Sequence, residues 1–200
     1  GHLAIIDDFP FIWEKFEEDD ILEKLGHPRI WSRRAEPSYA TTSPLIWPFM
    51  IEKINLEALK RITSGGLVPG RHTLLIEFSR GGPTGYADAL AHLDSRILAR
   101  AAILYIQVSF AESLRRNRAR YDEARKGSIL AHSVPEEAMH EVYATDDWPA
   151  LTADGSGYLN AGGLSVPYVT MNNEPESTDP AVLDGRYRGA LATLMTRWRH

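Results

Sequence analysis

The chain has 200 residues, enough for one domain of ordinary size with its own core. It contains no cysteine, which excludes disulfides and thiolate zinc sites, and its net charge of -5 argues against nucleic acid as the main partner. No segment reaches the ~20 apolar residues of a membrane span, and no signal peptide is recognisable. We therefore expect a cytoplasmic enzyme or binding domain whose partners include neither nucleic acid nor membrane.

Strand-like and helix-like segments alternate along the chain. Short apolar runs bounded by polar residues indicate strands, and apolar residues recurring about every 3.6 positions indicate helices. In the first half we predict, in order, a strand at Leu3–Asp7, a helix at Phe11–Leu25, a loop at Arg33–Pro44, a helix at Leu45–Ile62 and a strand at His72–Phe78. In the second half we predict a helix at Tyr86–Ala101, a strand at Ala102–Ser109, helices at Ala111–Lys126 and Pro135–Tyr143, a loop at Asp147–Gly163, a strand at Ser165–Met171 and a helix at Pro180–Trp198.

This alternation is typical of βαβ units. We expect a single α/β domain over residues 1–200, with a mainly parallel sheet and helices on both faces. Right-handed crossovers would then place the carboxyl ends of all the strands along one edge, where open α/β sheets bind their ligands.

Carboxylates follow the first two predicted strands. The first strand ends in Asp7-Asp8, and the second ends in Glu77, with Arg80 three residues further on. Carboxylates at a sheet edge suit Mg²⁺, and they also suit a base that accepts a proton from a substrate hydroxyl. Asp8 has an alternative role as the cap of the helix that begins near Pro10. Asp7 has no comparable structural role in the sequence, so it is the stronger functional candidate.

An arginine-rich helix follows the third predicted strand. Arg116 and Arg120 are four residues apart, and Arg115 and Arg118 are three apart, so each pair lies on one helix face. The planar guanidinium suits phosphate recognition. The alternative is a solvated basic face balanced by nearby acidic residues, including Glu112.

In this order the segments resemble the P-loop nucleoside and nucleotide kinase-like superfamily, in particular its uridine-kinase-like members. Ile5-Ile6-Asp7-Asp8-Phe9 resembles their second strand, which ends in an acidic residue near the phosphate acceptor. Leu74-Leu75-Ile76-Glu77-Phe78 is similar to their Walker B-type strand, although Phe78 stands where the family has glycine. The segment at about 111–147 is similar to their arginine-rich lid, and Asn172-Asn173-Glu174 resembles the loop beside the adenine.

The resemblance implies a three-layer P-loop NTPase-like sandwich without its usual first strand, and an enzyme that uses ATP, Mg²⁺ and a small-molecule substrate. The residues that it implies are Asp7, Asp8 and Glu77 for catalysis, Asp8 and Glu77 for the metal, Arg80, Arg115, Arg116, Arg118 and Arg120 for phosphate, and Asn172 and Asn173 for the nucleotide.

The sequence departs from this family in one decisive feature, because it contains no Gly-x-x-x-x-Gly-Lys-Ser/Thr phosphate loop. If a phosphate loop precedes this chain, we expect an ATP-dependent phosphotransferase. If the 200 residues are the whole protein, we expect no phosphoryl transfer. The alternatives are a non-catalytic nucleotide- or anion-binding regulatory domain and, third, a Mg²⁺-dependent phosphohydrolase. The third ranks last because such enzymes generally need Asp-x-Asp, whereas Asp7 and Asp8 are adjacent. The sequence indicates neither the acceptor nor the oligomeric state.

Overall fold

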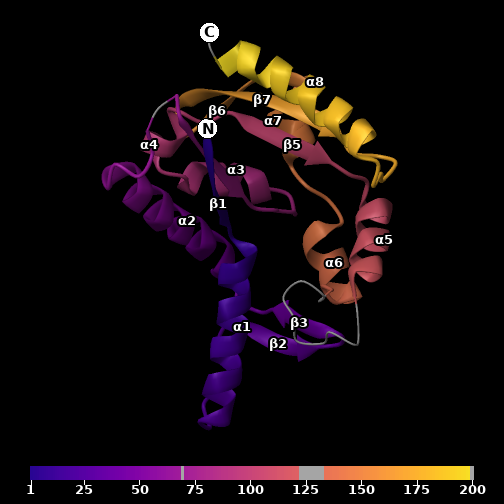
Figure 1. Cartoon of the computed structure of the whole chain (residues 1–200). Coiled ribbons are helices and arrows are strands. Elements are labelled where there is room, and N and C mark those ends of the chain that lie inside the picture. Colours follow the sequence, from indigo (N-terminus) through magenta and orange to yellow (C-terminus); the bar gives the residue numbers. More distant parts are fainter. Residues whose placement is uncertain (69, 122–132, 199–200) are drawn as a thin grey trace.

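The computed structural model describes residues 1–68, 70–121 and 133–198 and shows a mixed α/β fold (Figure 1). Its elements in the first half are β1 (His2–Asp7), α1 (Phe9–Lys24), β2 (Ser32–Ala35), β3 (Ser38–Thr41), α2 (Ile46–Thr63), β4 (His72–Glu77), α3 (Gly85–His92) and α4 (Ser95–Leu98). The second half contains β5 (Ile103–Gln107), α5 (Phe110–Arg120), α6 (Glu136–Tyr143), α7 (Trp148–Leu151), β6 (Ser156–Ala161), β7 (Leu164–Asn172) and α8 (Pro180–Trp198).

The described strands form three small sheets rather than the single mainly parallel sheet that the sequence predicts. β1 and β4 form a parallel pair, in which Asp7 is the register partner of Glu77. A second sheet consists of β5, β7 and β6. In it β7 is the central strand, parallel to β5 and antiparallel to β6. The predicted strands are therefore confirmed and two of their pairings are parallel, but these pairs are not hydrogen-bonded into one sheet.

One hydrophobic core joins the two sheets that contain parallel strands. Ile6 of β1 belongs to the same buried cluster as Ile54 of α2, Leu90 of α3 and Val166 of β7. On the other side of the second sheet, α8 packs mainly against β7 (Figure 1). A second cluster, which includes Phe16 of α1, fixes the smaller end of the molecule formed by α1, α2 and the β2–β3 hairpin.

The predicted loop at Arg33–Pro44 is wrong, because the antiparallel hairpin β2–β3 occupies most of it. Asp19 of α1 holds this hairpin in place. Its fully buried carboxylate accepts hydrogen bonds from the backbone N–H groups of Ile30, Trp31 and Ser32, and from the Ser32 hydroxyl. The hairpin thus depends on one carboxylate from outside its own strands.

The predicted loop at Asp147–Gly163 is also wrong in part, because it contains the short helix α7 and the strand β6. Gly162 and Gly163, with φ of 55° and 81°, form the tight turn that joins β6 to β7. A two-residue turn with positive φ at both positions is the usual connection of an antiparallel hairpin, and glycine adopts it without a steric penalty.

The predicted helices are confirmed with two changes. The helix predicted at Tyr86–Ala101 is interrupted at Leu93-Asp94, and Asp94 caps the short helix α4 by accepting a hydrogen bond from the Arg96 backbone. The helix predicted at Ala111–Lys126 ends at Arg120, and its last residues fall within 122–132, outside the described residues. None of the described helices is long and apolar enough to cross a membrane.

Candidate functional site

Asp8 and Arg80 form a buried ion pair at the carboxyl ends of β1 and β4. Both residues are about 5% exposed or less, and Arg80 Nη1 lies 2.6 Å from Asp8 Oδ2. The backbone brings them together because Asp8 N–H extends the β1–β4 ladder by donating to the Glu77 carbonyl. Asp8 Oδ1 has no hydrogen-bond partner within the described part of the chain, so one oxygen of this carboxylate can still accept a hydrogen bond.

The environment of this pair makes Asp8 harder to ionise than an ordinary aspartate. Burial raises the pKa of the Asp8 carboxyl from 3.8 to about 6, against the opposing effect of the Arg80 charge. The charges of Asp7 and Glu77 add to the increase. A carboxyl with a pKa near 6 is ionised at neutral pH and holds a transferred proton better than an ordinary aspartate does.

Aromatic rings enclose the Arg80 guanidinium. It lies 5.2 Å from the ring centre of Trp47 and 5.3 Å from that of Phe78, both within cation–π range. Its Nη1 also donates to the Ser79 carbonyl, whereas Nε is buried without a partner among the described residues. Arg80 is therefore fixed by Asp8 and its neighbours, and it is not freely available as the phosphate ligand that the resemblance implies.

The side-chain contact at the start of α1 comes from Asp7 and not from Asp8, the residue that the sequence suggests as the cap. Asp7 Oδ1 accepts a hydrogen bond from Phe9 N–H at the start of α1, at 2.9 Å. Asp8 precedes the helix as its N-cap residue but makes no capping hydrogen bond. Asp7 is therefore the residue with a structural explanation, and Asp8 is the unusual buried carboxylate.

Glu77 lies beside Asp7 and is exposed. Adjacent strands are about 4.8 Å apart, so these in-register carboxylates can approach the same cation. Mg²⁺ commonly binds to one or two protein carboxylates and completes its shell with water and phosphate oxygens. Asp7 and Glu77 fit this pattern better than Asp8, because the Arg80 guanidinium already occupies Asp8 Oδ2 and would repel a cation there. The described residues contain no group of three or more His, Asp or Glu side chains placed to hold a metal.

A glycine turn attaches this site to α6. A Cβ atom at Gly81 would lie 1.9 Å from the Val142 carbonyl oxygen, so only glycine allows the turn to approach α6 this closely. The next residue, Gly82, donates its N–H to the Thr145 carbonyl at 2.7 Å. Tyr143 of α6 lies near the ion pair, and burial together with the Asp8 charge raises its pKa to about 12.

The arginines of α5 are largely neutralised by neighbouring glutamates. Glu112 binds both Arg115 and Arg116, and the hydrogen bonds from these two arginines hold its pKa at about 2. Arg118 pairs with Glu136 of α6, so these side chains link α5 to α6. Arg120 is exposed and has no partner among the described residues. The structure thus places the four predicted arginines on one helix, and among the described residues Arg120 is the one of the four whose guanidinium has no partner.

Asn172 and Asn173 lie at the end of β7, where their side chains serve local structure. Asn172 Oδ1 accepts from the Glu174 backbone N–H, and Asn173 Oδ1 accepts from Arg186 of α8. The Asn173 carbonyl accepts from Arg116 at 2.7 Å. This hydrogen bond connects the arginine helix with the strand end predicted to bind the nucleotide.

Sequence reasoning missed Asp147 and the aromatic groups around the site. The buried Asp147 accepts hydrogen bonds from the backbone N–H groups of Tyr86 and Ala87 and so fixes the start of α3. The Tyr86 ring lies between Phe78, which follows β4, and Tyr105 of β5. No local signal in the sequence distinguishes Asp147 from a loop aspartate, because its partners are about sixty residues away.

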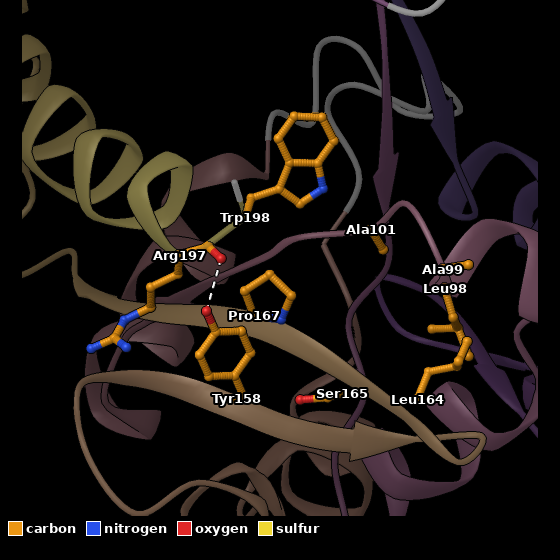
Figure 2. Close-up of a pocket in the computed structure, with 9 residues that line it drawn as sticks. All are labelled: Leu98, Ala99, Ala101, Tyr158, Leu164, Ser165, Pro167, Arg197 and Trp198. Carbon is orange, nitrogen blue, oxygen red and sulfur yellow. Dashed lines mark hydrogen bonds between the residues drawn. The ribbon is translucent and has the colours of Figure 1, made fainter. Parts of the chain in front are cut away.

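A separate hollow of about 410 Å³ lies where the end of α8 meets the β6–β7 hairpin and α4 (Figure 2). Several of its polar groups already have partners, although Arg197 Nε is buried without one among the described residues. The Tyr158 hydroxyl donates to the Arg197 carbonyl at 2.8 Å, and Trp198 Nε1 donates to the Arg100 carbonyl. None of the predicted site residues lines this hollow, and we assign no chemistry to it.

Comparison with protein-family models, curated proteins and solved structures found no match for this chain.

Proposed function

We propose that this chain belongs to an ATP-dependent phosphotransferase that acts on a hydroxyl group of a small molecule, with Asp8 as the general base. The observation that carries the proposal is the buried Asp8 carboxylate, which has one oxygen held by Arg80 and the other without a partner among the residues that the structure describes. A base needs a fixed orientation, a free oxygen and a pKa not far below the working pH. Asp8 has these three properties.

The proposed reaction uses Asp8 Oδ1 to accept the proton of the acceptor hydroxyl. The acceptor oxygen then forms a bond to the γ-phosphorus of ATP while the bond to the ADP oxygen breaks. The proton remains on Asp8 until solvent removes it. Arg80 is a positioning residue in this scheme, because it orients the carboxylate and does not contact the reacting atoms.

The other predicted residues would act on the phosphate side. Asp7 and Glu77 would hold Mg²⁺ at the strand ends, and the metal would neutralise charge on the transferred phosphate. Arg120 is the guanidinium on α5 that has no ion pair with any described residue and could therefore contact phosphate directly. The phosphate cradle itself has no counterpart in the sequence, since no Gly-x-x-x-x-Gly-Lys-Ser/Thr motif is present. A phosphate-binding loop outside these 200 residues is thus part of the proposal.

The arrangement of strands also supports the proposal that the two parallel pairs belong to a P-loop-like sheet. β1–β4 and β5–β7 are both parallel pairs, and they share one hydrophobic core without being hydrogen-bonded to each other. A strand carrying the phosphate loop between the two pairs would complete a sheet of the three-layer type.

The test is transfer of labelled phosphate from ATP to a panel of nucleosides and sugars in the presence of Mg²⁺. We expect the 200-residue chain alone to be inactive, and the protein expressed from its complete reading frame to label one acceptor class. An Asp8→Asn change should abolish the labelling, whereas an Asp184→Asn change on the exposed face of α8 should not. Labelling that survives Asp8→Asn would refute the role of Asp8.

The missing motif also favours a second candidate, a domain that binds a nucleotide or anion without catalysis. Here Arg120 of α5, which has no partner in the described part of the chain, would supply the charge. Calorimetric titration with ATP, ADP and phosphate distinguishes the two candidates. Binding that is weakened by Arg120→Gln, together with no transfer to any acceptor by the complete protein, would favour the binding domain. No heat with any of the three ligands would exclude it.

A further inference from the structure

One face of the β1–β4 pair is largely apolar and lies outside both buried clusters of the described residues. Exposure alternates along both strands, so that Ile6 and Ile76 face the core while Leu3, Ile5 and Leu75 face outward. The three outward side chains are each about half exposed, and they belong to neither buried cluster. We refer to Leu3, Ile5 and Leu75 as the open face. Parallel strands are normally covered on both faces, so an open face of this kind indicates a binding surface.

Opposite charges lie at the two ends of the open face. Asp7 and Glu77 continue the outward-facing positions at the carboxyl end of the strands. Arg71 directly precedes β4 at the other end. It is four positions before Leu75, so the alternation of the strand places it on the same outward face. The side chains of these three residues form no ion pair with any described residue. The surface therefore consists of a positive end, an apolar centre and a negative end.

The outer edge of β1 is blocked. The Arg61 side chain donates a hydrogen bond to the Ile5 carbonyl at 3.1 Å, and this contact occupies a backbone acceptor that an added strand would need. Proteins commonly protect an edge strand by covering it, and here the cover is a charged side chain from α2. The approach of a partner is thus favoured on the open face rather than at this edge.

We propose that the occupant of the open face is a second copy of this chain, packed face to face about a twofold axis. If the twofold axis lies between the two open faces and perpendicular to the strands, the strands of the second copy run in the opposite direction. This arrangement brings Arg71 of each copy against Asp7 and Glu77 of the other, while the Leu3, Ile5 and Leu75 side chains pack between the sheets. Because the two ends of the open face carry opposite charges, two copies of the same surface complement each other, and no different partner is needed.

The dimer is expected to be weak and dependent on salt. The apolar centre contains only a few side chains, and the ion pairs at its ends remain close to solvent, where each contributes little. Both the apolar and the ionic contacts occur twice by symmetry, so a single substitution removes two sets of contacts. This makes the proposal sensitive to point mutations.

The test is sedimentation equilibrium of the purified chain in EDTA, from about 1 μM to about 1 mM protein. We expect reversible dimers, with a dissociation constant that rises with salt. Leu75→Glu should raise this constant at least about tenfold, because it places two carboxylates in the apolar centre. The matched control is Leu191→Glu on α8, since Leu191 is 45% exposed and Leu75 is 46% exposed. Circular dichroism of both variants checks that each remains folded.

Charge reversal tests the proposed orientation. Arg71→Glu alone should weaken the dimer, and the double change Arg71→Glu with Glu77→Arg should restore it. A chain that stays monomeric throughout the concentration range would overturn the proposal. So would a dimer that Leu75→Glu leaves unchanged, or one that Arg71→Glu weakens but the double change does not restore. Mg²⁺ and Arg71 of the second copy would compete for Asp7 and Glu77, so the dimer is proposed for the metal-free chain. EDTA removes any metal from these carboxylates, so the dimer can fail this test while the proposed function holds.

Discussion

Asp8 and Arg80 are 72 residues apart in the chain and form an ion pair of 2.6 Å in the interior of the protein. The pair joins the end of β1 to the loop after β4, and Trp47 lies over the guanidinium. Buried ion pairs lose much of their Coulombic gain to desolvation, so such a pair is weak evidence for a purely stabilising role. Its position at the end of a parallel strand pair instead favours a role in chemistry.

Removal of Arg80 should be costly. Arg80→Met leaves the Asp8 carboxylate buried without its partner, and we expect a loss of about 3–5 kcal/mol in the free energy of unfolding measured with urea. Arg188→Met, which breaks an exposed pair with Asp184, should cost less than about 1 kcal/mol. The double variant Asp8→Asn with Arg80→Met should lose less than the sum of the two single variants. Additive losses would show that the two side chains are not coupled.

The titration of Asp8 should be visible in the pH dependence of stability. The folded pKa, about 6, lies above the unfolded value of 3.8, so the folded state binds more protons between these two pH values. The protonated Asp8 carboxyl contributes about 3 kcal/mol to the free energy of unfolding. This contribution is fully present below pH 3.8 and is lost as the pH rises through about 6. The measurement is the difference in unfolding free energy between wild type and Asp8→Asn from pH 4 to pH 7. A constant difference would contradict the raised pKa.

The Gly81 turn should not tolerate a side chain. Gly81→Ala would force the new Cβ against the Val142 carbonyl oxygen, 1.9 Å away, and a backbone atom cannot move aside cheaply. We expect a loss of about 3 kcal/mol in thermal or urea unfolding. Gly189→Ala is the control, because nothing lies within 4 Å of that Cβ position in α8. This control should stabilise the protein by up to about 1 kcal/mol. Equal effects of the two changes would contradict the close approach of the turn to α6.

The hairpin β2–β3 should depend on the Asp19 carboxylate. Both oxygens of Asp19 accept hydrogen bonds, so the amide of Asp19→Asn must place an NH₂ group against a donor. We expect a loss of about 2–3 kcal/mol. Hydrogen exchange should show faster exchange of the Ile30 and Ser32 amides while the β1–β4 ladder stays protected. Unchanged exchange at these amides would contradict the anchoring role.

Much of the framework could be predicted from the sequence because it is encoded locally. The strands that become β1, β4, β5 and β7 are short apolar runs between polar residues, and their observed ends differ from the predicted ones by no more than two residues. The β6–β7 hairpin was missed although its signal is present. Gly162-Gly163 between two strand-like runs is typical of a tight hairpin turn.

The elements that could not be predicted depend on distant partners. Ser32-Arg33-Arg34-Ala35 is polar and shows no strand pattern, and it is a strand because Asp19 binds the backbone just before it and β3 pairs with it. Asp7 and Asp8 could not be assigned correctly from local rules, because the partner of Asp8 lies on another strand. The burial that raises the pKa of Asp8 is likewise a property of the folded chain alone.

The most direct test of the central claim is phosphate transfer by the protein expressed from its complete reading frame, compared between wild type and Asp8→Asn. We expect the wild-type protein to transfer phosphate from ATP to a small-molecule hydroxyl at a rate that rises with pH through about 6. In Asp8→Asn this rate should fall by about 10²-fold or more. An Asp8→Asn protein that transfers phosphate as fast as wild type would contradict the central claim, as would a complete protein that labels no acceptor.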